Sequence, residues 1–257
     1  VMTLAEVIRG EQTSDEAVTE VAALALRMGK TPVIVADVAG FLVNRLLGPY
    51  LDEAIRLFED GADPVKVDKA MLDFGMPMGP FILLDEVGLD IASHASQSLL
   101  EAYGVRMTPA TGVTELMGPD RLGKKTGHGF YKHSKDRKVK PVISPDLKKY
   151  QKEGAAAQYS DQQIVDRLVL AMVNEAARCL EEQVVENAEM LDLATVFGTG
   201  FAPFRGGLLR YADSEGLGVI RDKLRKIAEM DVASREGGKE KFTPAALVEE
   251  LAGSGGS

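Results

Sequence analysis

Residues 41–60 read FLVNRLLGPYLDEAIRLFED, and residues 163–182 read QIVDRLVLAMVNEAARCLEE. In both stretches apolar residues recur at the three- and four-residue spacing of an amphipathic helix. A shift of 122 residues aligns the two stretches with seven identities, which keep their order along the chain. The identical pairs are Val43/Val165, Arg45/Arg167, Leu46/Leu168, Glu53/Glu175, Ala54/Ala176, Arg56/Arg178 and Glu59/Glu181. The sequence therefore predicts two copies of one helical unit, the first copy and the second copy.

The similarity continues beyond this helix if the register moves by one residue. Phe74-Gly75 then falls on Phe197-Gly198, and Pro80-Phe81 falls on Pro203-Phe204. Isologous dimers use the same surface on both partners, and a duplicated chain can keep that geometry internally. We therefore expect the two copies to pack on each other as a pseudo-dimer.

The first 36 residues have a different pattern. Residues 4–8 and 31–35 are typical of strands, and between them Thr13 and Glu16 have the spacing of a capping box. The helix that follows is expected to end near Met28. One strand–helix–strand unit cannot cover its own parallel strands. We therefore expect residues 1–36 to be the last piece of an α/β domain whose bulk lies upstream, and the weakest part of this chain.

Composition limits the classes of function. The chain has 257 residues and a net charge of −9, which disfavours binding to nucleic acid or to an anionic membrane surface. No apolar run reaches the roughly 18 residues of a membrane span. The single cysteine, Cys179, excludes an internal disulfide and is expected to be a buried thiol. The three histidines have no zinc spacing, so no metal site is expected, and a cytoplasmic setting fits.

Three motifs of the first copy resemble the C-terminal domain of 3-hydroxyacyl-CoA dehydrogenases: FLVNRLL at 41–47, MPMGPF at 76–81 and the closing motif GKKTGHGFY at 123–131. The second copy is similar to the extra repeat of the multifunctional fatty acid oxidation proteins, the alpha subunits of fatty acid oxidation complexes. The resemblance implies a mainly α fold with two tandem helical C-terminal-type repeats packed as a pseudo-dimer. A βαβ remnant of a Rossmann-type NAD domain is expected to precede them. The expected limits are 1–36 for the remnant, 37–133 and 161–257 for the copies, and 134–160 for an exposed linker.

The resemblance also implies a reaction, the oxidation of 3-hydroxyacyl-CoA to 3-oxoacyl-CoA with hydride transfer to NAD in fatty acid β-oxidation. Glu6 matches the family's carboxylate that orients a catalytic histidine, and Asn44 matches the asparagine that helps to place the substrate. Asp166 stands at the Asn44 position of the second copy, so only the first copy is expected to keep this residue.

Neither the histidine, expected before Val1, nor a Gly-x-Gly-x-x-Gly loop is present in the sequence. No residue here is therefore expected to bind the cofactor. NAD is expected in the full-length protein but not on this fragment, which should be inactive alone. The expected partners are the 3-hydroxyacyl-CoA substrate and the upstream NAD-binding domain.

Ordinary roles stay open for each of these residues. Glu6 could be a strand carboxylate that faces solvent, and Asn44 could hydrogen-bond locally at a helix end. His128 is expected to be exposed, and Lys124 and Lys125 to be a solvated pair, with coenzyme A phosphates as the alternative ligand. The alternative function is a helical interaction module that holds a partner chain such as a thiolase subunit and does no chemistry itself.

Overall fold

The computed structural model describes residues 3–136, 138–154, 158–230 and 236–254. The mostly helical architecture confirms the predicted fold class at that level. The chain divides into two compact units, Val1–Leu47 with Leu170–Ser257 as unit 1, and Gly48–Val169 as unit 2. Helices α2 (Val43–Glu59) and α7 (Asp161–Glu181) each contribute to both units.

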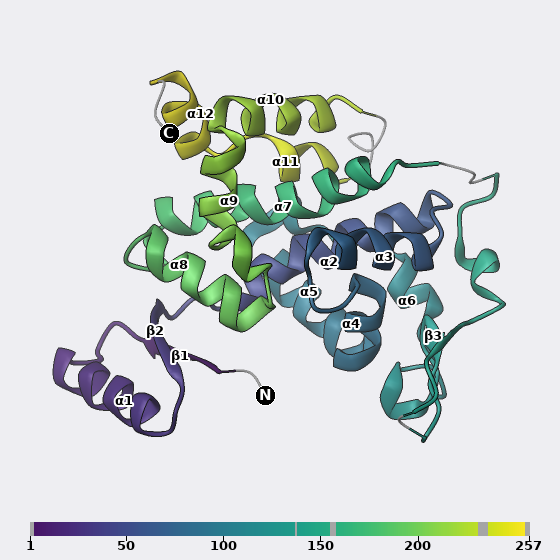
Figure 1. Cartoon of the computed structure of the whole chain (residues 1–257), viewed down its shortest axis with the longest axis horizontal. Helices are drawn as coiled ribbons and strands as arrows, with labels where there is room; N and C mark the ends of the chain where they lie inside the picture. The colour runs from purple at the N-terminus through teal and green to yellow at the C-terminus, as the bar shows by residue number, and fades with distance from the viewer. Residues whose placement is uncertain (1–2, 137, 155–157, 231–235, 255–257) are drawn as a thin grey trace. The chain divides into compact units, whose positions relative to one another are not determined.

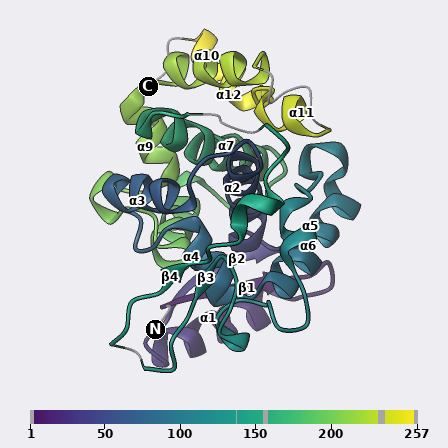
Figure 2. The same ribbon diagram turned by 90° about the vertical axis from the view of Figure 1, so that its right-hand side faces the viewer.

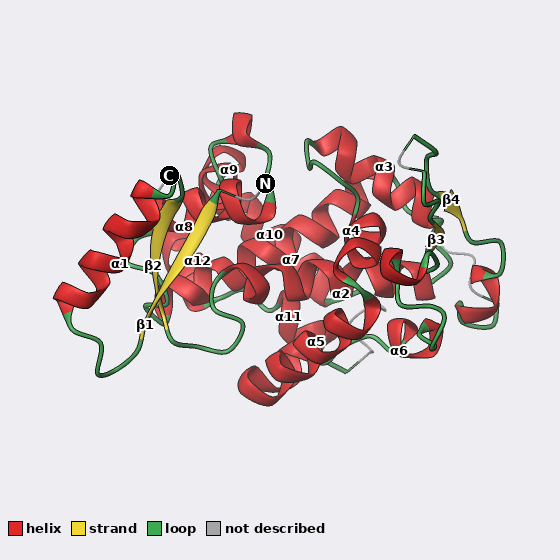
Figure 3. Ribbon diagram, turned by 90° about the horizontal axis from the view of Figure 1, so that it is seen from below, coloured by secondary structure: helices red, strands yellow, loops and turns green. Residues whose placement is uncertain are grey.

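Unit 1 begins with the predicted strand–helix–strand segment. Strand β1 (Leu4–Arg9) pairs in parallel with β2 (Thr31–Ala36), and α1 (Asp15–Arg27) connects them (Figure 3). The side chain of Ser14, not Thr13, caps α1 by accepting a hydrogen bond from the N–H of Ala17 at 3.2 Å. The predicted cap was therefore one residue too early, because the Thr13 hydroxyl accepts from the N–H of Gly10 instead.

The rest of unit 1 is helical and comes from the second copy. Helices α11 and α12 lie beside α10, and α8 contacts both α9 and β2 (Figures 1 and 2). The elements are α8 (Ala188–Ala194), a π-helical turn (Thr195–Thr199), a 3₁₀ turn (Pro203–Arg205), α9 (Leu208–Glu215), α10 (Leu217–Ala228), α11 (Gly238–Phe242) and α12 (Ala246–Gly253).

Unit 2 holds most of the first copy. As predicted, Asp63 caps a helix whose first residue is Pro64, and Gly75 ends that helix in the left-handed conformation, φ 118°. The core of this unit contains three fully buried phenylalanine rings in mutual contact, those of Phe58, Phe81 and Phe130. The elements are α3 (Pro64–Phe74), α4 (Pro80–Val87), α5 (Leu89–Tyr103), α6 (Gly112–Leu116), β3 (Tyr131–Lys132), β4 (Val142–Ile143) and three 3₁₀ turns (Gly104–Met107, Lys124–Thr126 and Leu147–Tyr150).

Residues 142–150 do not form an exposed linker. Strand β4 pairs antiparallel with β3, and the side chain of Leu147 is buried. The buried guanidinium of Arg121 donates to both carboxylate oxygens of Asp146, at 2.8 and 3.0 Å, and to the hydroxyl of Ser144. The lysine-rich composition predicted an exposed segment, but a single buried arginine, Arg121, fixes residues 142–150 on the unit. The domain limits themselves stay a prediction.

The predicted register between the copies is wrong from α3 onward, because Asp63 and Asn187, the N-cap residues of α3 and α8, are 124 residues apart (187 − 63) rather than 122 or 123. The carboxylate of Asp68 accepts a hydrogen bond from the N–H of Phe81 at 2.8 Å, at the start of α4. Asp192 makes the same contact at the start of α9, where it accepts from the N–H of Leu209 at 2.7 Å. These matching caps place Phe81 opposite Leu209 and not opposite Phe204.

The reason is a longer connection in the second copy. Helix α8 continues into the π-helical turn at 195–199, and the left-handed glycine that follows is Gly200. Gly200 is therefore the counterpart of Gly75, not Gly198. Pro203 and Phe204 lie in the extra loop, where the Phe204 side chain is 75% exposed.

Candidate functional site

Glu6 lies at the amino end of α2. Its Oε1 atom accepts hydrogen bonds from the N–H of Leu42 at 2.8 Å and from the N–H of Val43 at 3.3 Å. The first N–H groups of a helix have no partner inside the helix and favour a negative charge. The half-buried Glu6 side chain is thus directed at the helix rather than at bulk solvent.

The electrostatic environment of Glu6 has two opposing parts. Burial raises the pKa of its carboxyl, and the two backbone N–H groups lower it. The second oxygen, Oε2, accepts no hydrogen bond from the described residues. One oxygen is therefore fixed on the helix, and the other can accept a hydrogen bond from a group outside the chain described here.

Asn44 lies in the first turn of the same helix, directly after Val43. Its side chain is exposed and makes no hydrogen bond to any described residue. Glu6 and Asn44, the two residues predicted for the site, therefore come from different elements, 38 residues apart in sequence (44 − 6), and lie at one end of α2. The amide of Asn44 can donate to and accept from a bound molecule.

Sequence reasoning missed Phe41, which adjoins this end of α2. Its backbone is left-handed, φ 47°, as is that of Gly40, φ 75°. Such a conformation is strained for a residue with a side chain and persists only where its surroundings impose it. Here the Phe41 N–H is bonded to the Val38 carbonyl at 2.9 Å, and Glu6 holds the next two N–H groups. Phe41 as a whole residue is 37% exposed beside the candidate site.

The second copy packs against the two elements that form this site. A Cβ atom built on Gly198 would lie 2.5 Å from Leu4 Cδ2 and 2.6 Å from Val43 Cγ2, so only glycine allows this approach. Leu4 belongs to the strand of Glu6, and Val43 to the helix turn of Asn44. The π-helical turn of the second copy thus packs against both elements that carry the predicted site residues.

Other predicted candidates have ordinary structural roles. His128 is half-buried rather than exposed, with Nε2 at 2.8 Å from the Ser144 hydroxyl. Lys124 and Lys125 are exposed, and each forms an ion pair with a carboxylate. Cys179 is buried, as predicted. Within the described ranges no three metal-binding side chains cluster, and no described helix has the length and apolarity to cross a membrane.

Comparison with known families assigns all three parts of the chain. The model of the C-terminal domain of 3-hydroxyacyl-CoA dehydrogenases matches it twice, at residues 40–133 and 164–256. The model of the NAD binding domain of 3-hydroxyacyl-CoA dehydrogenases matches residues 1–38. This chain belongs to the 3-hydroxyacyl-CoA dehydrogenase family. The two matches of the C-terminal domain model fall on the first copy and on the second copy.

The similar curated proteins are alpha subunits of fatty acid oxidation complexes. That of Idiomarina loihiensis is 40% identical over 250 residues, which is 97% of this chain and 34% of the relative. That of Psychrobacter sp. is 46% identical over 223 residues, 84% of this chain and 31% of the relative. This chain spans about a third of the length of these relatives.

Solved structures agree with this fold. The 3-hydroxybutyryl-CoA dehydrogenase of Escherichia coli superimposes with a TM-score of 0.80 at 24% identity, over 98% of this chain and 68% of that one. The dehydrogenase part of multifunctional enzyme 1 from C. elegans gives a TM-score of 0.71 at 28% identity, over 97% and 56% of the two chains.

Proposed function

We propose that this chain is the substrate-side part of an NAD-dependent 3-hydroxyacyl-CoA dehydrogenase in fatty acid oxidation, which converts 3-hydroxyacyl-CoA to 3-oxoacyl-CoA. The observation that carries the proposal is the Glu6 carboxylate, held by one oxygen at the amino end of α2, where Asn44 is exposed. The family match and the alpha-subunit relatives support the same reaction class.

Glu6 acts through another residue in this proposal. Oxidation of a secondary alcohol needs a base to take the hydroxyl proton while hydride leaves the carbon, and an imidazole has a suitable pKa. The Oε2 atom of Glu6 would accept the ring N–H of an upstream histidine, fix its tautomer and stabilise the imidazolium. Burial strengthens this interaction, because the carboxylate and imidazolium attract each other more in a poorly solvated site.

Asn44 would contact the substrate directly. Its free amide can hold the oxygen of the hydroxyl or of the thioester, so that the reacting carbon faces the hydride acceptor. NAD supplies that acceptor when bound, but the residues of this chain do not fit it, since they include no dinucleotide loop. Upstream residues would therefore bind NAD, and this chain alone would neither bind NAD nor turn over substrate.

Two reciprocal ion pairs support the further proposal that the copies pack as a pseudo-dimer. In unit 1, Nε of Arg45 donates to Glu175 Oε1 at 2.8 Å. In unit 2, Nε and Nη2 of Arg167 donate to Glu53 Oε2 at 2.9 and 2.7 Å. At a shift of 122 residues Arg45 corresponds to Arg167, and Glu53 corresponds to Glu175. Each pair therefore joins the arginine of one copy to the glutamate of the other, which is the reciprocal pattern that a two-fold relation between the copies predicts. All four side chains are almost completely buried.

The test is Glu6→Gln in the full-length protein. Glutamine keeps an oxygen that can accept from the N–H groups at the helix end, so the fold should survive, but it carries no charge. We expect kcat to fall by about a hundredfold or more and KM to change little, because the charge acts on the transition state. Glu11→Gln, at an exposed glutamate nearby, is the matched control and should leave both constants unchanged. An unchanged kcat for Glu6→Gln would favour the interaction-module alternative with a thiolase-type partner.

A further inference from the structure

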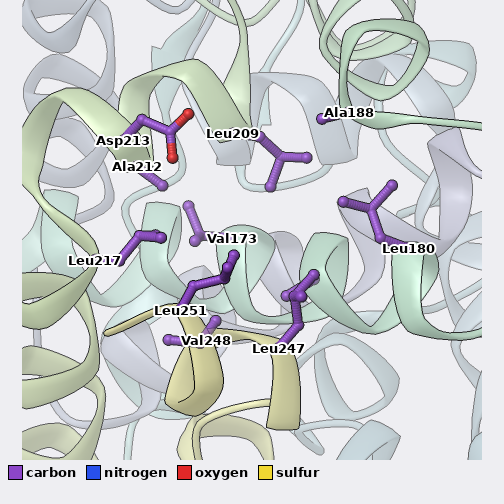
Figure 4. A pocket seen from close by; sticks show the side chains of 11 residues that line it. Val173, Leu180, Ala188, Leu209, Ala212, Asp213, Leu217, Leu247, Val248 and Leu251 are labelled. Carbon is purple, nitrogen blue, oxygen red and sulfur yellow. The ribbon is translucent and has the colours of Figure 1, made fainter. Parts of the chain in front are cut away.

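A cavity of about 250 Å³ lies within the second copy, in unit 1 (Figure 4). Its walls come from α7, α8, α9, α10 and α12, and are apolar except at one place. Figure 4 shows the side chains of Val173, Leu180 and Leu209 directed into it and the carboxylate of Asp213 at its edge. Asp213 is exposed and accepts no side-chain hydrogen bond from any described residue.

The first copy shows what this part of the fold can hold. The caps made by Asp68 and Asp192 align α4 with α9 from Phe81/Leu209 onward. In that register Asp213 is the counterpart of Asp85, and Ala212 is the counterpart of Leu84.

A second pair of contacts aligns another wall of the cavity. Glu59 Oε1 accepts the N–H of Gly112 at 2.7 Å, at the start of α6. Its counterpart Glu181 accepts the N–H of Leu247 in the first turn of α12. Helix α12 is therefore the counterpart of α6, and the cavity is lined in part by α7 and α9, the counterparts of the helices α2 and α4 that carry Phe58 and Phe81.

In the first copy an aromatic ring fills this space. The ring centroid of Phe130 lies 5.4 Å from that of Phe58 and 4.6 Å from that of Phe81. The buried carboxylate of Asp85 anchors the segment that carries the ring. It accepts the N–H of Phe130 at 2.8 Å and the N–H of Tyr131 at 2.9 Å, and lies 2.7 Å from Nε2 of His133.

The second copy keeps the carboxylate and enlarges the space. No described segment of the second copy places an aromatic ring where Phe130 lies in the first. Leu247 is larger than its counterpart Gly112, but five other lining side chains are smaller than their counterparts in the first copy. The changes are Leu51 to Val173, Ile55 to Ala177, Phe58 to Leu180, Phe81 to Leu209 and Leu84 to Ala212.

We propose that this cavity binds an extended polypeptide segment with an aromatic residue, as Phe130 and its neighbours bind in the first copy. The ring would lie between Leu180 and Leu209, and two consecutive backbone N–H groups would donate to Asp213. A dry cavity of about 150 Å³ already holds benzene, so 250 Å³ suffices for an aromatic side chain. An ionised carboxylate only accepts hydrogen bonds, so it favours N–H groups and repels the carboxylate of a fatty acid.

The probe is a synthetic peptide with the sequence of residues 127–133, GHGFYKH, titrated calorimetrically into the whole chain. We expect saturable binding. A peptide with alanine in place of Phe130 should bind at least about tenfold more weakly, because the ring is the apolar part that becomes buried.

Two variants of the chain test the location of binding. Ala177→Ile introduces the side chain of the first copy, fills the cavity and should abolish binding while the helix content stays unchanged. Asp213→Ala removes an exposed side chain, which leaves the fold intact, and should weaken binding about tenfold or more, as for hydrogen bonds to a charged group.

Three results would overturn the proposal. They are an absence of peptide binding, equal affinity of the parent chain and Ala177→Ile, and binding of decanoate in place of the peptide. Neither substrate nor NAD takes part in these titrations, so they do not depend on the proposed dehydrogenase reaction.

Discussion

The two copies carry the same carboxylate on equivalent helices and use it differently. Asp85 is fully buried and accepts hydrogen bonds from two backbone N–H groups and a histidine ring. Asp213 is exposed at the edge of a cavity. The helix-capping carboxylates Asp68 and Asp192, in contrast, make matching contacts in both copies. The contacts that fix these helices are therefore alike in the two copies, and the contacts that close the core differ.

The largest expected effect concerns the buried arginine–glutamate ion pairs, a feature in which the two copies agree. Glu53→Ala should lower the free energy of unfolding by about 3–5 kcal/mol, because it leaves Arg167 buried without its main partner. Glu175→Ala should cost less, since Arg45 keeps Glu182 at 2.8 Å. Urea unfolding measures both values. Losses below about 1 kcal/mol in both variants would show that these pairs do not hold the long helices together.

The next prediction concerns the difference between the copies. Asp85→Ala leaves three buried donors without their acceptor and should cost about 2–4 kcal/mol in urea unfolding. Asp213→Ala is the matched control and should leave the free energy of unfolding close to that of the parent. Equal losses would mean that Asp213 has buried partners and that the second copy is closed like the first.

The third prediction is a pH dependence that arises in the first copy. Burial raises the pKa of Asp68 to about 6, above its ordinary value of 3.8. The folded state therefore binds this proton more tightly than the unfolded chain, and stability should fall as pH rises from about 4 to 6. The loss is at most about 3 kcal/mol, at 1.4 kcal/mol per pKa unit.

Urea unfolding at several pH values, with Asp68→Asn as the variant, measures this slope. Asparagine can still accept the N–H of Phe81, so the cap should survive. The slope should be smaller in the variant but not zero, because burial also raises the pKa of Asp85. An identical slope in parent and variant would contradict the assignment to Asp68.

Local signals in the sequence predicted much of the fold. The repeated arginines and glutamates that predicted the two copies form buried ion pairs in the structure. The caps Asp63 and Gly75 were predicted correctly, since capping depends on residues within one turn. The register was lost in the loop before α8, at the π-helical turn of 195–199 and in the loop that holds the 3₁₀ turn at 203–205, which add chain length without a sequence signal.

Contacts at the site between residues far apart in the sequence could not be predicted from such local signals. The family motif identified Glu6, but its hydrogen bond to Leu42 joins residues 36 positions apart. The left-handed backbone of Phe41 has no signature, because phenylalanine rarely adopts it. The ion pair between the buried Arg121 and Asp146 is also non-local. The sequence did not predict it, because Asp146 lies in a segment whose composition is typical of an exposed surface.

The smallest expected effect concerns a loop at which the copies also differ. In the second copy the carbonyl of Val184 accepts the N–H of Ala36 at 2.9 Å, at the end of β2. In the first copy the equivalent carbonyl, that of Ala62, accepts the side-chain amide of Gln151 at 3.4 Å and no other hydrogen bond from the described residues. The second copy therefore holds one end of the β1–β2 pair, and protection from amide exchange should fall along β2 with distance from Ala36.

A parallel ladder directs alternate N–H groups of β2 toward β1, those of Thr31, Val33 and Val35. The N–H of Ile34 is directed at the other edge, and its side chain is 41% exposed. We expect the Ile34 amide to exchange at least about tenfold faster than that of Val35. Hydrogen exchange followed by NMR on the monomer at low concentration resolves each amide. If Ile34 exchanged as slowly as Leu46 of α2, the far edge of β2 would already be paired, and these strands would belong to a complete sheet.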